Sequence, residues 1–216
     1  MRKVFLLAVI CGVWGGSQAM ASSLCSVVAG NLVSNCGFET GDFTGWTIGG
    51  DTDNPGGYYF GVDGFDANSG NDVAFMSQDF NDDGIGSVSL SQTLATTAGD
   101  TYSVSFWLDQ DTPPYVNYIH SFDSTFGSST LLNITPSVAL PGAVGTYTQY
   151  TYSETATGAS TALTFSFEND DWFWSFDDVS VTDTSASATP EPSTWILAGA
   201  ALGALFLLKR VRSSSH

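Results

Sequence analysis

Residues 88–108 read VSLSQTLATTAGDTYSVSFWL. Apolar residues recur at every second position of the two halves, with one break in the first half: Val88, Leu90, Leu94, Tyr102, Val104 and Phe106. A period of two is the spacing of a strand that buries one face. The triplet Ala98-Gly99-Asp100 between the halves is a turn signal. The segment therefore predicts two short strands joined by a tight turn.

The same alternation recurs toward the end of the chain, in YTQYTYSE (147–154), ALTFSFEN (162–169) and FDDVSVT (176–182). Turn signals stand at 141–142, 157–160 and 169–171. No apolar period of 3.6 residues is long enough for a helix in this region. Short strands separated by Gly, Asp and Pro turns indicate an all-β fold, an antiparallel jelly-roll β-sandwich over residues 31–182. About 150 residues suffice for one core.

The N-terminus has the three parts of a secretory signal peptide, predicted over residues 1–21. Arg2 and Lys3 precede an apolar run, and Ala19-Met20-Ala21 is a cleavage site for signal peptidase. The mature chain would begin near Ser22 with a short leader, 22–30. Cys25 and Cys36 then remain in an oxidising compartment, where one disulfide is plausible; the sequence alone leaves open whether they are bonded.

Charge is distributed very unevenly along the chain. The 216 residues include 22 Asp and Glu but only five Lys and Arg, for a net charge of −17. All five basic residues lie in the two ends, at positions 2, 3, 209, 210 and 212. Nucleic acid is excluded as a partner, because phosphate contacts need Lys or Arg. The acidic groups of the domain must be solvated, hydrogen-bonded or neutralised by a cation such as Ca²⁺.

The C-terminal end has a modular organisation. A Ser/Thr/Ala linker, 183–189, leads to the motif Pro-Glu-Pro-Ser-Thr at 190–194, and an apolar stretch at 195–208 precedes a basic cluster at 209–212. The apolar stretch predicts a helix that is short for a membrane span, which needs about 20 residues. The basic cluster places the C-terminus in the cytoplasm by the positive-inside rule.

This tail resembles the PEP-CTERM protein-sorting signal of Gram-negative bacteria. The residues that carry the resemblance are Pro190, Glu191, Pro192, Lys209, Arg210 and Arg212. The resemblance implies recognition by an exosortase, a transient stay in the inner membrane and cleavage near 190–192. The protein would then reach the outer cell surface or the extracellular matrix. The alternative is an ordinary C-terminal membrane anchor.

Three segments of the domain resemble carbohydrate-binding modules and other galactose-binding-like jelly rolls. They are NLVSNCGFETGDFTGWT (31–47), residues 89–108, and FENDDWFWSFDDVSVT (167–182). The resemblance implies a structural Ca²⁺ that ties the first strand to the last. The ligands it implies here are Glu39, Asp66, Asp177 and Asp178. The alternative is that the two adjacent Asp residues lie at a sheet edge and face water.

A second candidate calcium loop is DFNDDG, residues 79–84. Asp79, Asn81 and Asp83 match the start of a calcium-binding loop. The twelfth position is Leu90 rather than Glu, so the loop is not an EF-hand. A polar turn explains the same residues.

Sugar binding requires aromatic faces that stack on pyranose rings, with polar groups for the hydroxyls. The candidates are Tyr58, Tyr59, Tyr115, Tyr118, Trp172 and Trp174, with Asp109 and Asn117 close in sequence. Trp46 and Trp107 are expected in the core. In the run 172–174 either both Trp side chains face outward or Phe173 does.

Catalysis has little support, because no pair of carboxylates is marked and no nucleophile or metalloenzyme motif is present. We therefore expect a non-enzymatic exported protein that binds carbohydrate or exopolysaccharide through a calcium-stabilised sandwich. The alternative of a different class is a structural matrix or adhesion protein without a glycan pocket.

Overall fold

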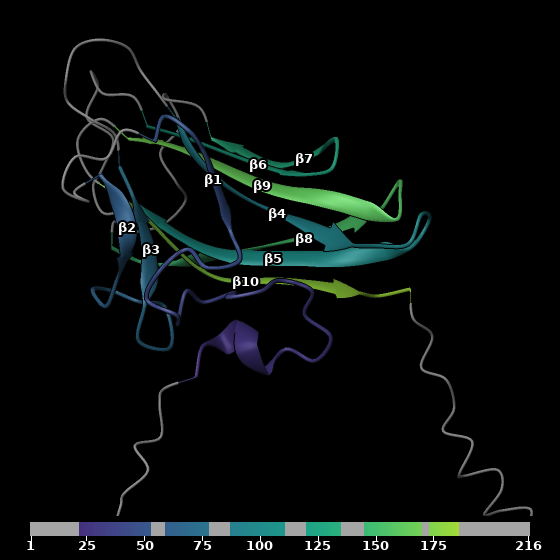
Figure 1. The fold of residues 1–216 in the computed structure, drawn as a ribbon, viewed down its shortest axis with the longest axis horizontal. Coiled ribbons are helices and arrows are strands. Elements are labelled where there is room, and N and C mark those ends of the chain that lie inside the picture. Colours follow the sequence, from purple (N-terminus) through teal and green to yellow (C-terminus); the bar gives the residue numbers. More distant parts are fainter. Residues whose placement is uncertain are drawn as a thin grey trace, which may run out of the picture.

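The computed structural model describes residues 22–52, 59–77, 87–110, 120–134, 145–169 and 173–185. This part of the chain forms two five-stranded antiparallel sheets that pack face to face (Figure 1). The predicted antiparallel jelly-roll β-sandwich is confirmed. The predicted signal peptide and the predicted C-terminal helix lie outside the described residues. Among the residues described, no helix has the length and apolar character needed to cross a membrane.

The first sheet has the strand order β1-β4-β9-β6-β7. Its strands are β1 (Thr47–Gly50), β4 (Val88–Ala95), β9 (Ser160–Asn169), β6 (His120–Phe126) and β7 (Ser129–Ile134). The second sheet has the order β2-β3-β10-β5-β8. Its strands are β2 (Phe60–Asp63), β3 (Val73–Met76), β10 (Trp174–Asp183), β5 (Thr101–Gln110) and β8 (Thr148–Thr155).

The period-two segments form strands whose apolar residues face the opposite sheet. In β5 the inward positions are Tyr102, Val104, Phe106 and Leu108, all buried. The break in the apolar pattern of β4 falls on Gln92, which is also buried. Its amide bonds the backbone of Ser34, accepting from the N–H at 3.1 Å and donating to the C=O at 2.7 Å. A buried polar group is tolerated there because both halves of its amide are satisfied.

Aromatic rings fill the space between the sheets. The Phe106 ring meets the Phe165 ring edge to face at a centroid distance of 5.1 Å. It also lies 5.9 Å from the Phe176 ring of the neighbouring strand. Trp46 is a core residue, as predicted, and stacks on Phe38 at 5.7 Å. Such pairs add to the free energy that burial of apolar area supplies.

Strand β10 contains a bulge that sets the position of two aspartates. Its register with β5 shifts between Asp177 and Ser180. Asp178 occupies the left-handed region with φ of 52°. A residue inserted in this way leaves both Phe176 and Val179 facing the core, although they are three positions apart.

The N-terminal segment is joined to the outer side of β10. The short helix η1 (Leu24–Val27), purple in Figure 1, lies beneath that strand. Cys25 and Cys36 form a disulfide. A cross-link that closes a loop of this size stabilises a domain by about 2–3 kcal/mol. The predicted leader is thus part of the folded unit.

Candidate functional site

Asp177 and Asp178 form a buried acidic pair at the β10 bulge. Their side chains are 0% and 2% exposed. Asp177 accepts hydrogen bonds from the backbone N–H groups of Asn68 at 3.0 Å and Ser69 at 3.2 Å. It also accepts the N–H of Asp178 at 2.7 Å. These donors hold the β2–β3 connection against the outer face of the second sheet.

Asp178 links the same connection to the N-terminal segment. Its Oδ1 accepts the N–H of Cys25 at 3.1 Å. Its Oδ2 accepts from Asn68 Nδ2 at 2.8 Å and from Ser69 Oγ at 2.7 Å. The acidic pair therefore holds together three segments that are far apart in the sequence.

The electrostatics of the acidic pair are unusual for carboxyl groups. Burial, and then the charge of Asp178, raise the pKa of Asp177 to about 8, against the opposing effect of its N–H donors. No Lys or Arg occurs between residues 4 and 208 to compensate the charge. Two adjacent buried carboxylates favour taking up one proton between them.

We expect stability to fall as pH rises from about 5 to 8. The folded state holds its proton more tightly than the unfolded chain, whose Asp titrates near 4, so folding is favoured at the lower pH. The expected slope of the unfolding free energy is at most about −1.4 kcal/mol per pH unit. Urea denaturation in chelator at pH 5, 6.5 and 8 measures it. An unfolding free energy that rises with pH over this range would contradict the raised pKa of Asp177. In the control variant Asp177→Asn, the unfolding free energy should depend less on pH.

The other two predicted calcium ligands lie apart from this pair. Glu39 accepts the backbone N–H of Asn71 at 2.9 Å and that of Asp72 at 3.3 Å. Its carboxylate packs against Gly70, where φ is +75° and an added Cβ would overlap it. Asp66 lies in the groove described below. Within the described ranges, no three His, Cys, Asp or Glu side chains form a group that could hold a metal ion. The second candidate loop, Asp79, Asn81 and Asp83, lies outside those ranges.

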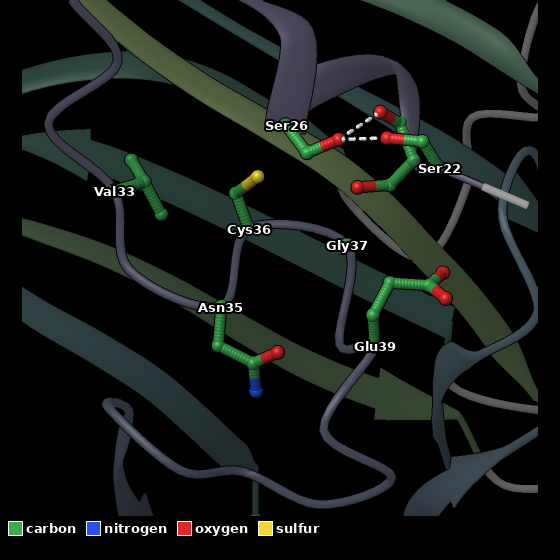
Figure 2. A pocket seen from close by; sticks show the side chains of 8 residues that line it. Ser22, Ser26, Val33, Asn35, Cys36, Gly37 and Glu39 are labelled. Atoms are coloured by element: carbon green, nitrogen blue, oxygen red, sulfur yellow. Dashed lines mark hydrogen bonds between the residues drawn. The ribbon is translucent and has the colours of Figure 1, made fainter. Parts of the chain in front are cut away.

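A hollow of about 510 Å³ lies beside the disulfide (Figure 2). The serines of the N-terminal segment form one side of it, and Ser26 Oγ contacts Ser22 Oγ at 2.6 Å. Glu39 forms part of its rim. Its lining residues are Ser22, Ser23, Ser26, Val33, Asn35, Cys36, Gly37 and Glu39. None is aromatic, so this hollow has no surface on which a sugar ring could stack.

A second hollow, of about 460 Å³, lies on the outer face of the second sheet. We call it the Trp107 groove, and it is lined by Asp66, Ala67, Asn68, Trp107, Asp109, Gly145, Thr146 and Tyr147. Trp107 is half-buried on β5 and faces outward, because its neighbours Phe106 and Leu108 face the core. It pairs with Asp177 of β10 and Gln149 of β8. The groove therefore combines an aromatic surface with polar walls.

Both walls of the Trp107 groove are held by carboxylates. On one side, Asn68 N–H donates to Asp177, so the acidic pair fixes the segment 66–68. On the other side, Thr146 N–H donates to Asp109 Oδ1 at 2.9 Å. The same oxygen accepts the N–H of Gln110 at 2.8 Å. Each wall is therefore held by backbone N–H groups that donate to a buried carboxyl oxygen.

Asp109 has an environment that disfavours its charged form. It is 4% exposed. Burial raises its pKa, and the charge of Asp66 adds to the rise, while the backbone N–H groups of Gln110, Thr146 and Gly145 oppose it. Asp66 itself occupies the left-handed region with φ of 58°. The groove thus holds two carboxylates within interaction range of each other.

The predicted sugar-stacking residues are only partly placed on this surface. Trp174 is 0% exposed and donates its indole N–H to the Glu168 carbonyl at 3.0 Å, so its assignment to ligand binding is wrong. Phe173 instead faces outward, against Phe75. Tyr59 packs against the core. Tyr58, Tyr115, Tyr118 and Trp172 lie outside the described residues.

Trp107 was expected in the core, and the structure corrects this. The error came from its neighbour Phe106, which is a core residue. The alternation of Tyr102, Val104 and Phe106 already assigns position 107 to the opposite face. Tyr147 could have been found in the same way, because Tyr150 and Tyr152 occupy the inward face of β8.

Comparisons place the fold among known β-sandwiches. No protein-family model matches the chain, and no curated protein matches it. An apo cyclase from Fischerella sp. is 18% identical, with 79% of this chain and 100% of that chain covered and a TM-score of 0.50. The module TmCBM61, solved with β-1,4-galactotriose, is 22% identical over 71% of this chain and 98% of that one, with a TM-score of 0.48. A family 16 carbohydrate-binding module is 16% identical over 70% and 99%, with a TM-score of 0.47.

These neighbours share the sandwich architecture with the chain. They include carbohydrate-binding modules and cyclases. Likeness at this level of sequence identity shows the fold alone, so the function must be argued from the site.

Proposed function

We propose that the domain binds carbohydrate in the Trp107 groove. The observation that carries the proposal is the half-buried Trp107 in a concave, polar-walled surface of sugar-sized volume. The apolar face of a pyranose ring stacks on an aromatic ring, which fixes its position without charge. Asn68, Asp109 and Tyr147 contribute to the polar lining of the groove, as sugar recognition requires.

The test is binding of the secreted domain to soluble polysaccharides in native affinity electrophoresis. We expect retardation by at least one neutral or amino polysaccharide. A folded domain that no polysaccharide retards, and that self-associates instead, would support the structural matrix or adhesion role.

We also propose that the chain is exported and sorted by an exosortase. The support is the order of motif, apolar stretch and basic cluster at 190–212, together with the signal peptide at 1–21. The domain itself carries the disulfide that an oxidising compartment permits. Mass spectrometry of the mature protein from cells should find Ser22 as the first residue and a C-terminus near 190–192. Recovery of the chain through His216 would contradict exosortase processing.

Calcium binding at the acidic pair is a third proposal. Asp177 and Asp178 bring two uncompensated charges into a buried position, and a divalent cation would relieve their repulsion. The cation would need further oxygen ligands from carbonyl groups or water, because it takes six to eight. We expect chelator to lower the thermal unfolding midpoint and added Ca²⁺ to restore it, with a larger effect at pH 8 than at pH 5. A thermal midpoint that neither chelator nor added Ca²⁺ changes would show that hydrogen bonds alone hold the acidic pair.

A further inference from the structure

The charged side chains of the Trp107 groove all carry the same sign. Asp66 lies on one wall and Asp109 on the other, and no lining residue is basic. The nearest Lys or Arg in sequence lies outside residues 4–208. The one histidine of the described residues, His120, is 3% exposed and lies on β6 of the opposite sheet. A ligand in the groove therefore meets negative potential from both walls and no compensating charge.

Such an arrangement would discriminate among glycans by their charge. A uronic acid or a sulfated sugar would be repelled by both carboxylates, and no protein cation would offset the repulsion. A neutral sugar would stack without electrostatic gain. A sugar with a protonated amino group would form a charge-assisted hydrogen bond to a carboxylate.

Burial disfavours the charged form of Asp109, and a positively charged group beside it would offset that effect. Its hydrogen bonds from Gln110 N–H and Thr146 N–H both fall on Oδ1. The side chain lines the groove while only 4% exposed, so a charge beside it is poorly screened by solvent. Trp107 lies two residues before Asp109 on β5, and its side chain faces outward. Its aromatic surface would hold the sugar ring whose amino group contacts Asp109.

We propose that the Trp107 groove selects glycans that carry free amino groups, such as β-1,4-linked glucosamine, over N-acetylated and anionic glycans. This inference rests on the proposed function, because it names the ligand class of the same groove. The carboxylates of Asp66 and Asp109 set the selectivity, and Trp107 provides the affinity common to neutral and amino sugars.

The experiment is isothermal titration of the folded domain with three hexasaccharides: glucosamine, N-acetylglucosamine and galacturonate. We expect the glucosamine hexamer to bind about tenfold more tightly than the acetylated one, and the galacturonate hexamer not to bind. The preference should shrink at 0.5 M NaCl, because salt screens the charge interaction.

The matched variants are Asp66→Asn and Asp109→Asn, singly and together. Asn tolerates the left-handed conformation at position 66. At position 109 the Asn amide oxygen can accept both N–H bonds that Oδ1 accepts. The double variant should bind both neutral and amino hexamers with similar affinity. Asp183→Asn, an exposed change at the end of β10, controls for general attraction to an acidic protein and should leave the preference intact.

The outcomes separate the two proposals. Equal affinity for the glucosamine and N-acetylglucosamine hexamers would overturn the charge selection and leave carbohydrate binding standing. A preference that Asp183→Asn reduces as much as Asp109→Asn does would also overturn it. If a folded domain binds neither these hexamers nor any other polysaccharide, the proposed function fails as well.

Discussion

Replacement of Asp178 by alanine is expected to lower the free energy of unfolding by about 4 kcal/mol. The change removes the acceptor of three donors, from Cys25, Asn68 and Ser69. A donor left unsatisfied in a buried site costs about 1–3 kcal/mol. Alanine also tolerates the left-handed conformation of position 178 poorly. Since small domains have about 5–15 kcal/mol in total, this loss is large.

Urea denaturation measures the effect, and two variants make it specific. Asp178→Asn keeps one acceptor oxygen and tolerates the left-handed backbone, so it should cost less than half as much as the alanine variant. Asp183→Ala removes an exposed aspartate of the same strand and should change stability by no more than about 0.5 kcal/mol. An alanine variant within about 1 kcal/mol of the parent would contradict the role given to the acidic pair.

Replacement of Trp107 by alanine is expected to weaken carbohydrate binding by about 30-fold or more. A central aromatic side chain whose truncation removes the stacking surface costs about 2 kcal/mol or more. The fold should persist, because Trp107 lies on the outer face of the sheet and its removal leaves no cavity between the sheets. Affinity electrophoresis measures the loss, and the thermal midpoint verifies folding.

Matched changes separate stacking from stability. Trp107→Tyr retains an aromatic face and should keep much of the affinity. Trp174→Phe alters a fully buried ring, so it should lower stability while leaving the affinity of the folded protein unchanged. If Trp107→Ala binds like the parent protein, the groove is not the binding site.

The sandwich could be predicted from the sequence because its signal is local. The alternation at 101–108 and 162–167 corresponds to buried positions of β5 and β9 almost residue by residue. The bulge in β10 was not predicted: residues 176–182 were taken as one more alternating segment, and the structure shows a register shift between Asp177 and Ser180. Where apolar residues alternate with a period of two, the local sequence is enough to assign each side chain to a face of the strand.

The acidic pair could be predicted only in part. Adjacent aspartates without basic partners require some form of compensation, and this much follows from composition. The donors that provide it, on Asn68 and Ser69, are about a hundred residues away along the chain. Nothing local distinguishes them from any other loop residues. Glu39 and Asp66 were assigned to the same place, and the structure puts them against Asn71 and in the Trp107 groove instead.

The aromatic residues show why binding surfaces are harder to predict than cores. Trp174 was assigned to a sugar site, yet it starts a strand whose next inward residue is Phe176. Trp107 was assigned to the core because it follows a core residue directly. In both cases the parity of the position within its strand decides the face, and ring size does not.

The most direct test of carbohydrate binding in the Trp107 groove is an NMR titration of the folded domain with a polysaccharide fragment that it binds. The account predicts chemical-shift changes at the Trp107 indole and at the backbone amides of Asn68, Thr146 and Tyr147. Changes confined to the hollow beside the Cys25–Cys36 disulfide, with the Trp107 signals unmoved, would contradict it.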